Sequence, residues 1–469
     1  MPETELPQTA GADRPALKAG QIVELTVEKL VPGGEGLARH QGLTVFVPEG
    51  LPGDRLRARV ISTKPAYARA LIEAVLLPAA MRLTPPCPVV AACGGCQWQH
   101  QAYAAQLLAK RELLLETMAK IGGWDAEALE PLCSAVAGMA EPWHYRNKGQ
   151  FPFQRVAGRL EAGFYAPRSH DLVALDTCLI HHQAINEILA WTVARAREAG
   201  IQAYDEVSRT GELRHLIIRH GFRTHQTLVG FVTRSPRVPG LDELATELIQ
   251  AFPTVTGVVQ NIQPQPGNRI LGDENRILSG TGIYLDQLDG LRFEVSLPSF
   301  FQVNPLQTEV LYATAAEGAA IGSADTVIDA YSGAGTISLW LARRCREVIG
   351  IEQVAAATAD AGRNADLNGI ANARFETGKV EALLPALVRQ LPAAPVIVLD
   401  PPRKGCEPAV LETVAKAGVE RLVYVSCNPA TLARDSVLLR QSGFRLQALR
   451  PVDMFPHTHH LETVALFQR

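Results

Sequence analysis

A cysteine at the end of a predicted strand could act as a nucleophile. The stretch "RLVYVSCNP" is apolar and β-branched up to Ser426, which predicts a buried strand, and Pro429 starts a turn because proline cannot continue a ladder. Cys427 therefore lies where a core strand ends. It is either an inert buried thiol or a nucleophile at the rim of a site. Glu462, directly before the apolar run "TVALF", could serve as a general base.

A glycine-containing loop predicts a cofactor site. In "DAYSGAGTISL", Gly333 and Gly335 permit a tight turn between a strand and a helix, and the close approach of a ligand to the backbone. Glu352 ends the next strand, in the position of a carboxylate that binds ribose hydroxyls. Ser338 replaces the third glycine of a dinucleotide fingerprint. Together with Asp329 before the loop, this favours S-adenosylmethionine, which brings no pyrophosphate to a helix N-terminus.

These groups suit methylation of carbon 5 of a pyrimidine. Asp400, in "VIVLDPPRKGC", ends a further strand and adds a carboxylate at the rim. Carbon 5 is too weak a nucleophile to take a methyl group unaided. Addition of a thiolate to carbon 6 creates an enolate that can attack the donor, and a base must then remove the proton on carbon 5. Cys427 and Glu462 fit these two roles.

Three clustered cysteines predict a metal site. Cys87, Cys93 and Cys96 follow the spacing C-x5-C-x2-C, with a Gly-Gly pair that lets the backbone fold tightly. Zinc in a tetrahedral sulfur site and an iron–sulfur cluster are both compatible with this pattern. The fourth ligand is either Cys178, in "VALDTCLIHH", or Cys133, and the spacing leaves this choice open.

Three regions must position these residues. Short apolar runs with Gly/Pro turns from Gly20 to about Leu77 predict a small β-barrel of oligonucleotide-binding type. Its run "RLRARV" places three arginines on one face of a strand, either as a nucleic-acid-binding stripe or as a solvated surface. This arginine stripe consists of Arg55, Arg57 and Arg59. A mixed α+β region follows, and from Asp325 strands and helices alternate, which predicts a parallel, doubly wound sheet with ligands at the carboxyl ends of its strands.

The composition is that of a globular protein without a membrane span. The chain has 469 residues, enough for about three domains. Its net charge of −3 means that any nucleic-acid binding has to rest on local basic patches. No apolar run is long enough to cross a bilayer, and the acidic, proline-containing N-terminus is not a signal peptide. We therefore expect a cytoplasmic monomer, in which the eight cysteines are reduced.

The chain resembles the S-adenosylmethionine-dependent RNA 5-methyluridine methyltransferases that carry an N-terminal TRAM domain. The resemblance rests on "SFFQVNPLQTEVLY", "DAYSGAGTISL", "YVSCNPATLARD" and "DMFPHTHHLETVALF", together with "CPVVAACGGCQWQH". It implies Cys427 as nucleophile and Glu462 as base. It implies S-adenosylmethionine contacts from Gln302, Tyr331, Glu352 and Asp400. It also implies a [4Fe-4S] cluster on Cys87, Cys93, Cys96 and Cys178. The family often has Asp or Asn where Lys379 stands, so the adenine contact stays open.

The resemblance also suggests a substrate and a domain plan. Relatives with both a TRAM domain and a cluster typically modify ribosomal RNA, so 23S ribosomal RNA is the expected substrate. Transfer RNA is the alternative, and a non-catalytic RNA-binding iron–sulfur protein is a second one. The expected parts are a disordered tail (1–18), a TRAM barrel (19–77), a central α+β region with the cluster (78–290) and a Rossmann-like α/β methyltransferase domain (291–469).

Overall fold

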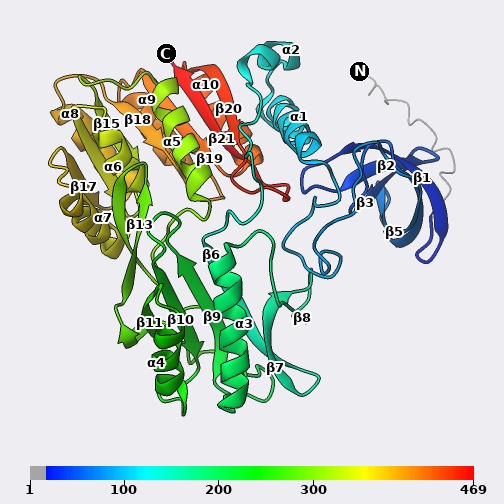
Figure 1. The fold of residues 1–469 in the computed structure, drawn as a ribbon. Helices are drawn as coiled ribbons and strands as arrows, with labels where there is room; N and C mark the ends of the chain where they lie inside the picture. Colours follow the sequence, from blue (N-terminus) through cyan, green and yellow to red (C-terminus); the bar gives the residue numbers. More distant parts are fainter. Residues whose placement is uncertain (1–16) are drawn as a thin grey trace, which may run out of the picture. The chain divides into compact units, whose positions relative to one another are not determined.

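The computed structural model describes residues 17–469 (Figure 1), so the predicted disordered tail lies almost wholly outside the described residues. No described helix is long and apolar enough to span a membrane. The chain divides into two compact units. Unit 1 contains residues up to Pro86, together with Cys96–Ala109 and His457–His459, and unit 2 contains Cys87–Gly95, Lys110–Pro456 and His460–Arg469.

Unit 1 holds the predicted β-barrel. Its five strands close in the order β1-β2-β3-β5-β4, which confirms the barrel expected from the short runs and turns. The strands are β1 (Ile22–Leu30), β2 (Gly36–His40), β3 (Leu43–Val47), β4 (Arg55–Thr63) and β5 (Tyr67–Leu77). Buried and exposed residues alternate along β4, so Leu56, Ala58 and Val60 fill the barrel core while the arginine stripe faces outward, as predicted.

The central region of unit 2 is a seven-stranded mixed sheet in the order β12-β11-β10-β9-β6-β7-β8. Its strands are β6 (Lys148–Val156), β7 (Arg159–Tyr165), β8 (Leu172–Ala174), β9 (Leu213–His220), β10 (Thr227–Thr233), β11 (Val255–Ile262) and β12 (Glu274–Gly280). Two amphipathic helices, α3 (Gln183–Glu198) and α4 (Leu241–Ala251), share one apolar cluster with this sheet. Before it come α1 (Tyr103–Gly122), α2 (Ala126–Leu129) and the 3-10 helix η1 (Glu130–Leu132).

The C-terminal part of unit 2 contains the sheet that positions the predicted site (Figure 1). The strand order is β17-β16-β15-β18-β19-β21-β20. The strands are β15 (Thr326–Ala330), β16 (Glu347–Glu352), β17 (Ala373–Thr377), β18 (Val396–Leu399), β19 (Arg421–Ser426), β20 (Arg445–Val452) and β21 (Glu462–Gln468). Ahead of this sheet lie a hairpin, β13 (Ile283–Leu288) with β14 (Leu291–Ser296), and α5 (Pro305–Gly318).

Helices connect the parallel strands of this sheet. They are α6 (Thr336–Ala342), α7 (Ala355–Leu367), α8 (Val380–Gln390), α9 (Pro408–Lys416) and α10 (Pro429–Gln441). The chain runs from β15 to β16 and β17 on one side of β15, and then returns to β18 and β19 on the other side. Because crossovers between parallel strands are right-handed, this reversal places α6 and α7 on one face of the sheet and α8 and α9 on the other. The reversal lies between β15 and β18, where doubly wound sheets bind their ligands.

The sheet is not wholly parallel, which corrects the expectation from the alternating pattern. Strands β15 to β19 pair in parallel, but β21 pairs antiparallel with both β19 and β20. An antiparallel strand begins at the edge where its parallel neighbours end. The first residue of β21, Glu462, therefore lies at the carboxyl edge of the sheet.

Candidate active site

Four carboxylates and one thiol follow each other along the carboxyl edge of this sheet. Glu352 ends β16, Asp329 is the penultimate residue of β15 and Asp400 follows β18. Cys427 follows β19, and Glu462 begins β21. These five strands succeed one another across the sheet in the order β16, β15, β18, β19, β21, so the five residues form a continuous line. We call the four acids the carboxylate row.

Cys427 and Glu462 are neighbours across an antiparallel pair. In the register of β19 and β21, Ser426 lies opposite Thr463. One further step along the same register brings Cys427 opposite Glu462, and side chains at such positions are close enough to interact. Cys427 is half-buried and Glu462 is buried. The fold thus brings together the two groups that the sequence singled out as nucleophile and base.

The surroundings of Cys427 favour its protonated form. Burial first, and then the charges of Glu462 and Asp400, raise the pKa of this thiol to about 11, while Arg403 opposes the shift. Burial and Asp400 also raise the pKa of Glu462 well above its usual range, again against Arg403. The acids around this site thus favour the uncharged form of its thiol.

The pKa values of two further members of the row, Asp400 and Asp329, are also raised. Burial raises the pKa of Asp400 to about 7. Burial, followed by the charges of Asp400 and Glu352, raises the pKa of Asp329 to about 7, although Ser338 donates a hydrogen bond to its carboxylate. The other oxygen of Asp329, Oδ1, is buried without a hydrogen-bond partner. A cationic ligand next to these carboxylates would stabilise their charged forms.

The glycine-containing loop lies at the middle of this row. Tyr331 has φ = +76° and donates its backbone N–H to the carbonyl of Ile351 at 2.9 Å, which turns the chain out of β15. Gly335 has φ = +82°, and a Cβ there would come within 2.9 Å of Ala361 Cβ, so only glycine fits. Glu352 accepts hydrogen bonds from the backbone N–H of Gly333 at 3.1 Å and of Val354 at 2.8 Å. The loop and its carboxylate are thus held in one arrangement.

Gln302 lies in the segment that leads into α5. Asn147 holds this segment: its side-chain amide donates to the carbonyl of Gln302 at 3.2 Å, and its backbone N–H donates to the carbonyl of Val303 at 2.9 Å. Asn304 then caps α5 by accepting from the N–H of Gln307. The neighbouring Phe300 is 71% exposed, an unusual state for a large aromatic side chain.

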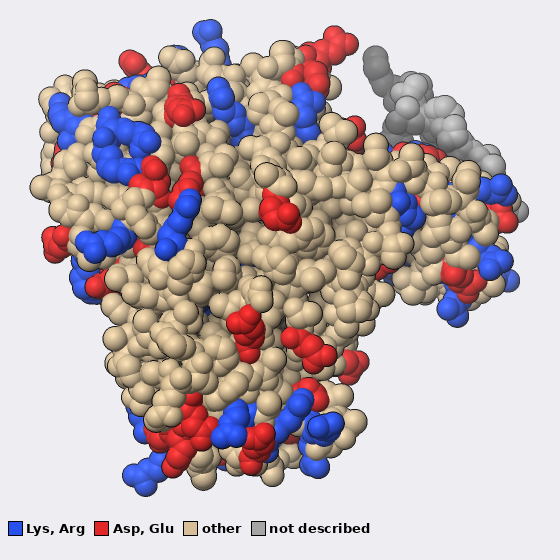
Figure 2. All heavy atoms as spheres, viewed as in Figure 1, with Lys and Arg blue, Asp and Glu red and all other residues tan. Residues whose placement is uncertain are grey.

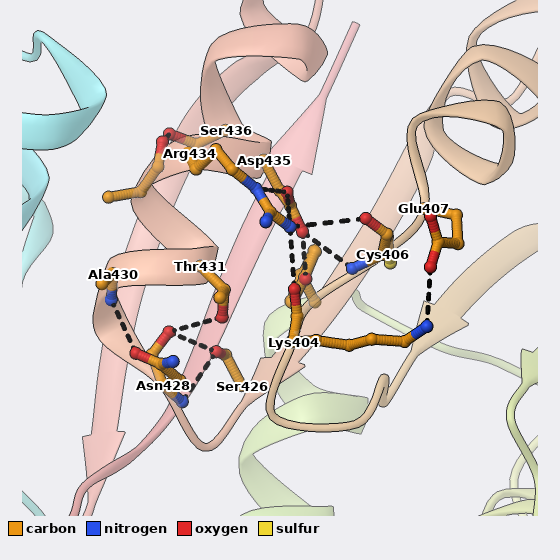
Figure 3. Close-up of polar contacts among 12 residues, drawn as sticks. Lys404, Cys406, Glu407, Ser426, Asn428, Ala430, Thr431, Arg434, Asp435 and Ser436 are labelled. Carbon is orange, nitrogen blue, oxygen red and sulfur yellow. Dashed lines mark hydrogen bonds and ion pairs between the residues drawn. The ribbon is translucent and has the colours of Figure 1, made fainter.

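The loop after Asp400 is fixed by Asp435 on α10 (Figure 3). The Oδ2 atom of Asp435 accepts from the N–H of Cys406 at 2.9 Å and from the hydroxyl of Tyr424 at 2.6 Å. Asn428 donates to the carbonyl of Arg403 at 3.2 Å, which ties the same loop to the turn after Cys427. In "DPPRKGC", sequence reasoning assigned a role only to Asp400 and missed Arg403. The sequence did contain a signal for this residue, namely a cationic side chain directly after the two prolines that follow Asp400.

Some of the predicted metal ligands lie near one another, but they do not form a complete site. Among residues 17–469, no three His, Cys, Asp or Glu side chains form a group that could hold a metal ion. Cys178 nevertheless lies close to Cys93 and Cys87, since both thiols contribute, after burial, to raising its pKa. Cys133 instead pairs with Leu449 at the outer edge of β20, and burial raises its pKa to about 11. Cys96 belongs to unit 1.

The face drawn in Figure 2 carries no broad basic surface. Lys and Arg form small groups on it, among Asp and Glu and wide uncharged areas. Two members of the arginine stripe are paired: Arg55 with Glu24 at 2.7 Å and Arg59 with Glu73 at 3.2 Å. Charge on the barrel is thus partly neutralised, and RNA binding must use local groups.

Comparisons with known proteins agree with this arrangement. A family described as tRNA (Uracil-5-)-methyltransferase matches residues 290–469, and the TRAM domain family matches residues 16–72. A protein of Halalkalibacterium halodurans named as an RNA methyltransferase is 42% identical over 447 residues, 95% of this chain and 97% of its own length. One from Listeria innocua is 43% identical over 450 residues, 96% of this chain and 98% of its own.

A solved structure shares the fold. The Pyrococcus abyssi tRNA (uracil-54, C5)-methyltransferase, in complex with S-adenosyl-L-homocysteine, superposes with a TM-score of 0.74. The match covers 95% of this chain and all of that one, at 24% sequence identity. At this level of identity the likeness concerns the fold alone.

Proposed function

The chain belongs to the TRAM-domain RNA (uracil-5-)-methyltransferases, and on this premise we propose that it methylates carbon 5 of a uridine in 23S ribosomal RNA through a covalent adduct with Cys427. Family membership itself makes the protein an S-adenosylmethionine-dependent RNA methyltransferase. The observation that carries the mechanistic part is the register of β19 and β21, which pairs Ser426 with Thr463, the residues adjoining Cys427 and Glu462. The charge of Glu462 also raises the pKa of Cys427, as expected of neighbouring groups.

In this mechanism Cys427 and Glu462 act in sequence. The Cys427 thiolate forms a bond to carbon 6 of the target uracil, and the electron pair of the 5,6 double bond becomes available at carbon 5. Carbon 5 would then form a bond to the methyl group of the donor, whose carbon–sulfur bond breaks so that the sulfonium leaves as a neutral thioether. Glu462 removes the proton left on carbon 5, the double bond re-forms and the thiolate leaves. Arg403, which lowers the pKa of Cys427, favours the thiolate needed for the first step.

S-adenosylmethionine supplies an electrophilic methyl group on a sulfonium cation. We propose that Glu352 binds its ribose hydroxyls, with Tyr331 and Gln302 alongside, and that Asp400 lies near its positive charge. The carboxylate row supports this assignment, because burial raises the pKa values of Asp400 and Asp329, with the charges of Asp400 and Glu352 adding to the shift at Asp329, and a nearby cation would favour the charged carboxylates. A bound cation would also lower the pKa of Cys427, so the thiolate would form mainly when the methyl donor is present.

Two RNA classes are candidates for the substrate. The TRAM domain and the clustered cysteines support ribosomal RNA, because the family resemblance described under Sequence analysis associates these two features with ribosomal-RNA enzymes. Transfer RNA is the second candidate, favoured by the description of the matched family and by the substrate in the name of the Pyrococcus abyssi enzyme. A purely RNA-binding role is disfavoured by the presence of both Cys427 and Glu462.

We also propose a [4Fe-4S] cluster held by four cysteines of the central region, residues 78–290. Its ligands are Cys87, Cys93, Cys96 and Cys178. Support comes from the C-x5-C-x2-C spacing and from the closeness of Cys178 to Cys93 and Cys87, whereas Cys133 lies against β20.

The substrate is tested by mapping 5-methyluridine in ribosomal and transfer RNA from cells with and without this protein. Loss of a 23S ribosomal RNA site on deletion is the expected result. Loss confined to transfer RNA would establish the second candidate. No change in either RNA would refute both.

The covalent step is tested by trapping. Glu462→Gln should form a heat-stable complex between protein and RNA, because addition and methyl transfer precede the proton removal that this variant cannot perform. The complex should vanish when Cys427→Ala is added. Full methylation by the single Cys427→Ala variant would refute the mechanism.

A further inference from the structure

Three cations gather at one end of the central sheet. In the antiparallel pairing of β6 and β9, Lys148 lies directly opposite Arg219. Arg146, two residues earlier, donates its Nε–H to the carbonyl of Lys148 at 3.1 Å. Like charges directly across a strand pair destabilise a sheet. A favourable interaction must therefore offset the repulsion between Lys148 and Arg219.

No carboxylate compensates these charges. Among residues 17–469, none of the three forms a salt bridge, and Arg219 is buried against neutral acceptors, the carbonyls of Leu297, at 3.1 Å, and Ser299. Burial, and then Arg219 and Arg146, lower the pKa of Lys148 to about 7. Lys148 is half-buried, and Arg146 is also partly accessible. The three cations thus have no anionic partner among the described residues. A ligand could supply one.

The cluster adjoins the proposed active site. Asn147, between Arg146 and Lys148, bonds to the carbonyls of Gln302 and Val303. Arg219 bonds to Ser299 at the start of the same segment. The segment 299–303 therefore links the three cations to the residue expected to contact the methyl donor. An anion bound at the cluster would lie beside this segment.

We propose that Lys148 and Arg146 bind a backbone phosphate of the substrate RNA next to the methylated uridine, while Arg219 positions the 299–303 segment. This inference rests on the proposed function. The carboxylate of S-adenosylmethionine is the other available anion. The cluster lies on the central sheet, however, whereas the loop expected to hold that cofactor follows β15 in the C-terminal sheet. A phosphate also matches several cations better than a single carboxylate does, and such contacts position RNA without reading its sequence.

The test measures RNA affinity against salt for Lys148→Met, with a 23S ribosomal RNA transcript as probe. The variant should bind more weakly, and its plot of log K against log salt should be shallower by about 0.7 to 1, the value of one lost phosphate contact. Its affinity for S-adenosylmethionine should be unchanged, and its thermal stability equal or higher because a repulsion is removed. Lys416→Met, at an exposed position of α9 where Lys416 pairs with Glu412, is the matched control and should keep the wild-type slope.

A charge-preserving variant separates binding from folding. Lys148→Arg should retain the wild-type salt slope. If Met and Arg variants lose RNA affinity equally, the effect is structural and the inference is wrong. Unchanged affinity in Lys148→Met, or a loss confined to S-adenosylmethionine, would also overturn it while leaving the proposed function intact. If the wild-type protein methylates no RNA, the proposed function fails instead.

Discussion

The reactivity of Cys427 offers a quantitative test of the active-site electrostatics. Its pKa is about 11, against an ordinary value of 9.0 for a thiol. At pH 8 this lowers the thiolate fraction about a hundredfold relative to an unperturbed thiol. A more basic thiolate is also the better nucleophile, and a Brønsted coefficient of about 0.45 recovers roughly eightfold. Alkylation of Cys427 in the ligand-free protein should therefore be about tenfold slower than that of an unperturbed, equally accessible thiol.

Two neutralising substitutions should change this rate in opposite directions. Glu462→Gln removes the charge that most raises the pKa of Cys427 after burial, so the pKa should fall and alkylation should accelerate. Arg403→Gln removes the charge that lowers the same pKa, so alkylation should slow. The pKa of Glu462 is itself raised, and this group ionises only as the pH increases. The gap between wild type and Glu462→Gln should consequently widen toward higher pH.

The assay follows iodoacetamide labelling of the Cys427 peptide by mass spectrometry over a neutral to alkaline pH series. Cys133 is an internal control in every sample, because its pKa is also about 11 but depends on burial, Arg111 and Glu130, none of which belongs to the carboxylate row. Its labelling rate should be equal in all variants. Equal or slower labelling of Cys427 in Glu462→Gln, with Cys133 unchanged, would refute the electrostatic coupling of thiol and carboxylate.

Three further predictions concern other parts of the molecule. The pKa of Asp329 is raised to about 7 in the fold, so the stability it contributes is fully present below about pH 3.8 and is lost as the pH rises through 7. Asp329→Asn should flatten this decline in a thermal melt of ligand-free protein, and an unaltered pH profile would exclude Asp329 as its cause. Anaerobically purified protein should be brown with about four irons per chain. Cys178→Ser should lose the iron while Cys133→Ser keeps it; the reverse would identify Cys133 as the ligand. Neutral replacement of the arginine stripe should lower the salt slope of RNA binding by less than three, since two of its members are already paired; an unchanged slope would make it a solvated surface.

Local patterns predicted the elements but not how the last two strands pair. The apolar run before Cys427 and the proline after it are sufficient to place this thiol at the end of a strand. Nothing local to Glu462 indicates that β21 inserts between β19 and β20. That choice depends on contacts between segments far apart in the sequence, and it alone makes Glu462 a neighbour of Cys427. The sequence therefore suggested the two groups, while their register came only from the fold.

Charge environments were the least predictable feature. The alternation in "RLRARV" predicted correctly that the arginine stripe shares one exposed face. Its partial neutralisation depends on Glu24 and Glu73, which other strands supply. Lys148 and Arg219 likewise look ordinary in their own strands, and only the cross-strand register reveals their repulsion. Such effects arise from pairs of residues, so a single stretch of sequence does not contain them.

The insertion of β21 also has a consequence for biosynthesis. β21 is the last strand of this sheet to be synthesised, and until it docks, β19 has an unpaired edge of hydrophobic residues such as Val423 and Val425. Open strand edges of this kind pair readily with other chains. A nascent or truncated chain lacking β21 is therefore expected to need protection from aggregation. The docking that covers this edge also brings Glu462 next to Cys427, so on the proposed mechanism the active site is complete only once the edge of β19 is paired.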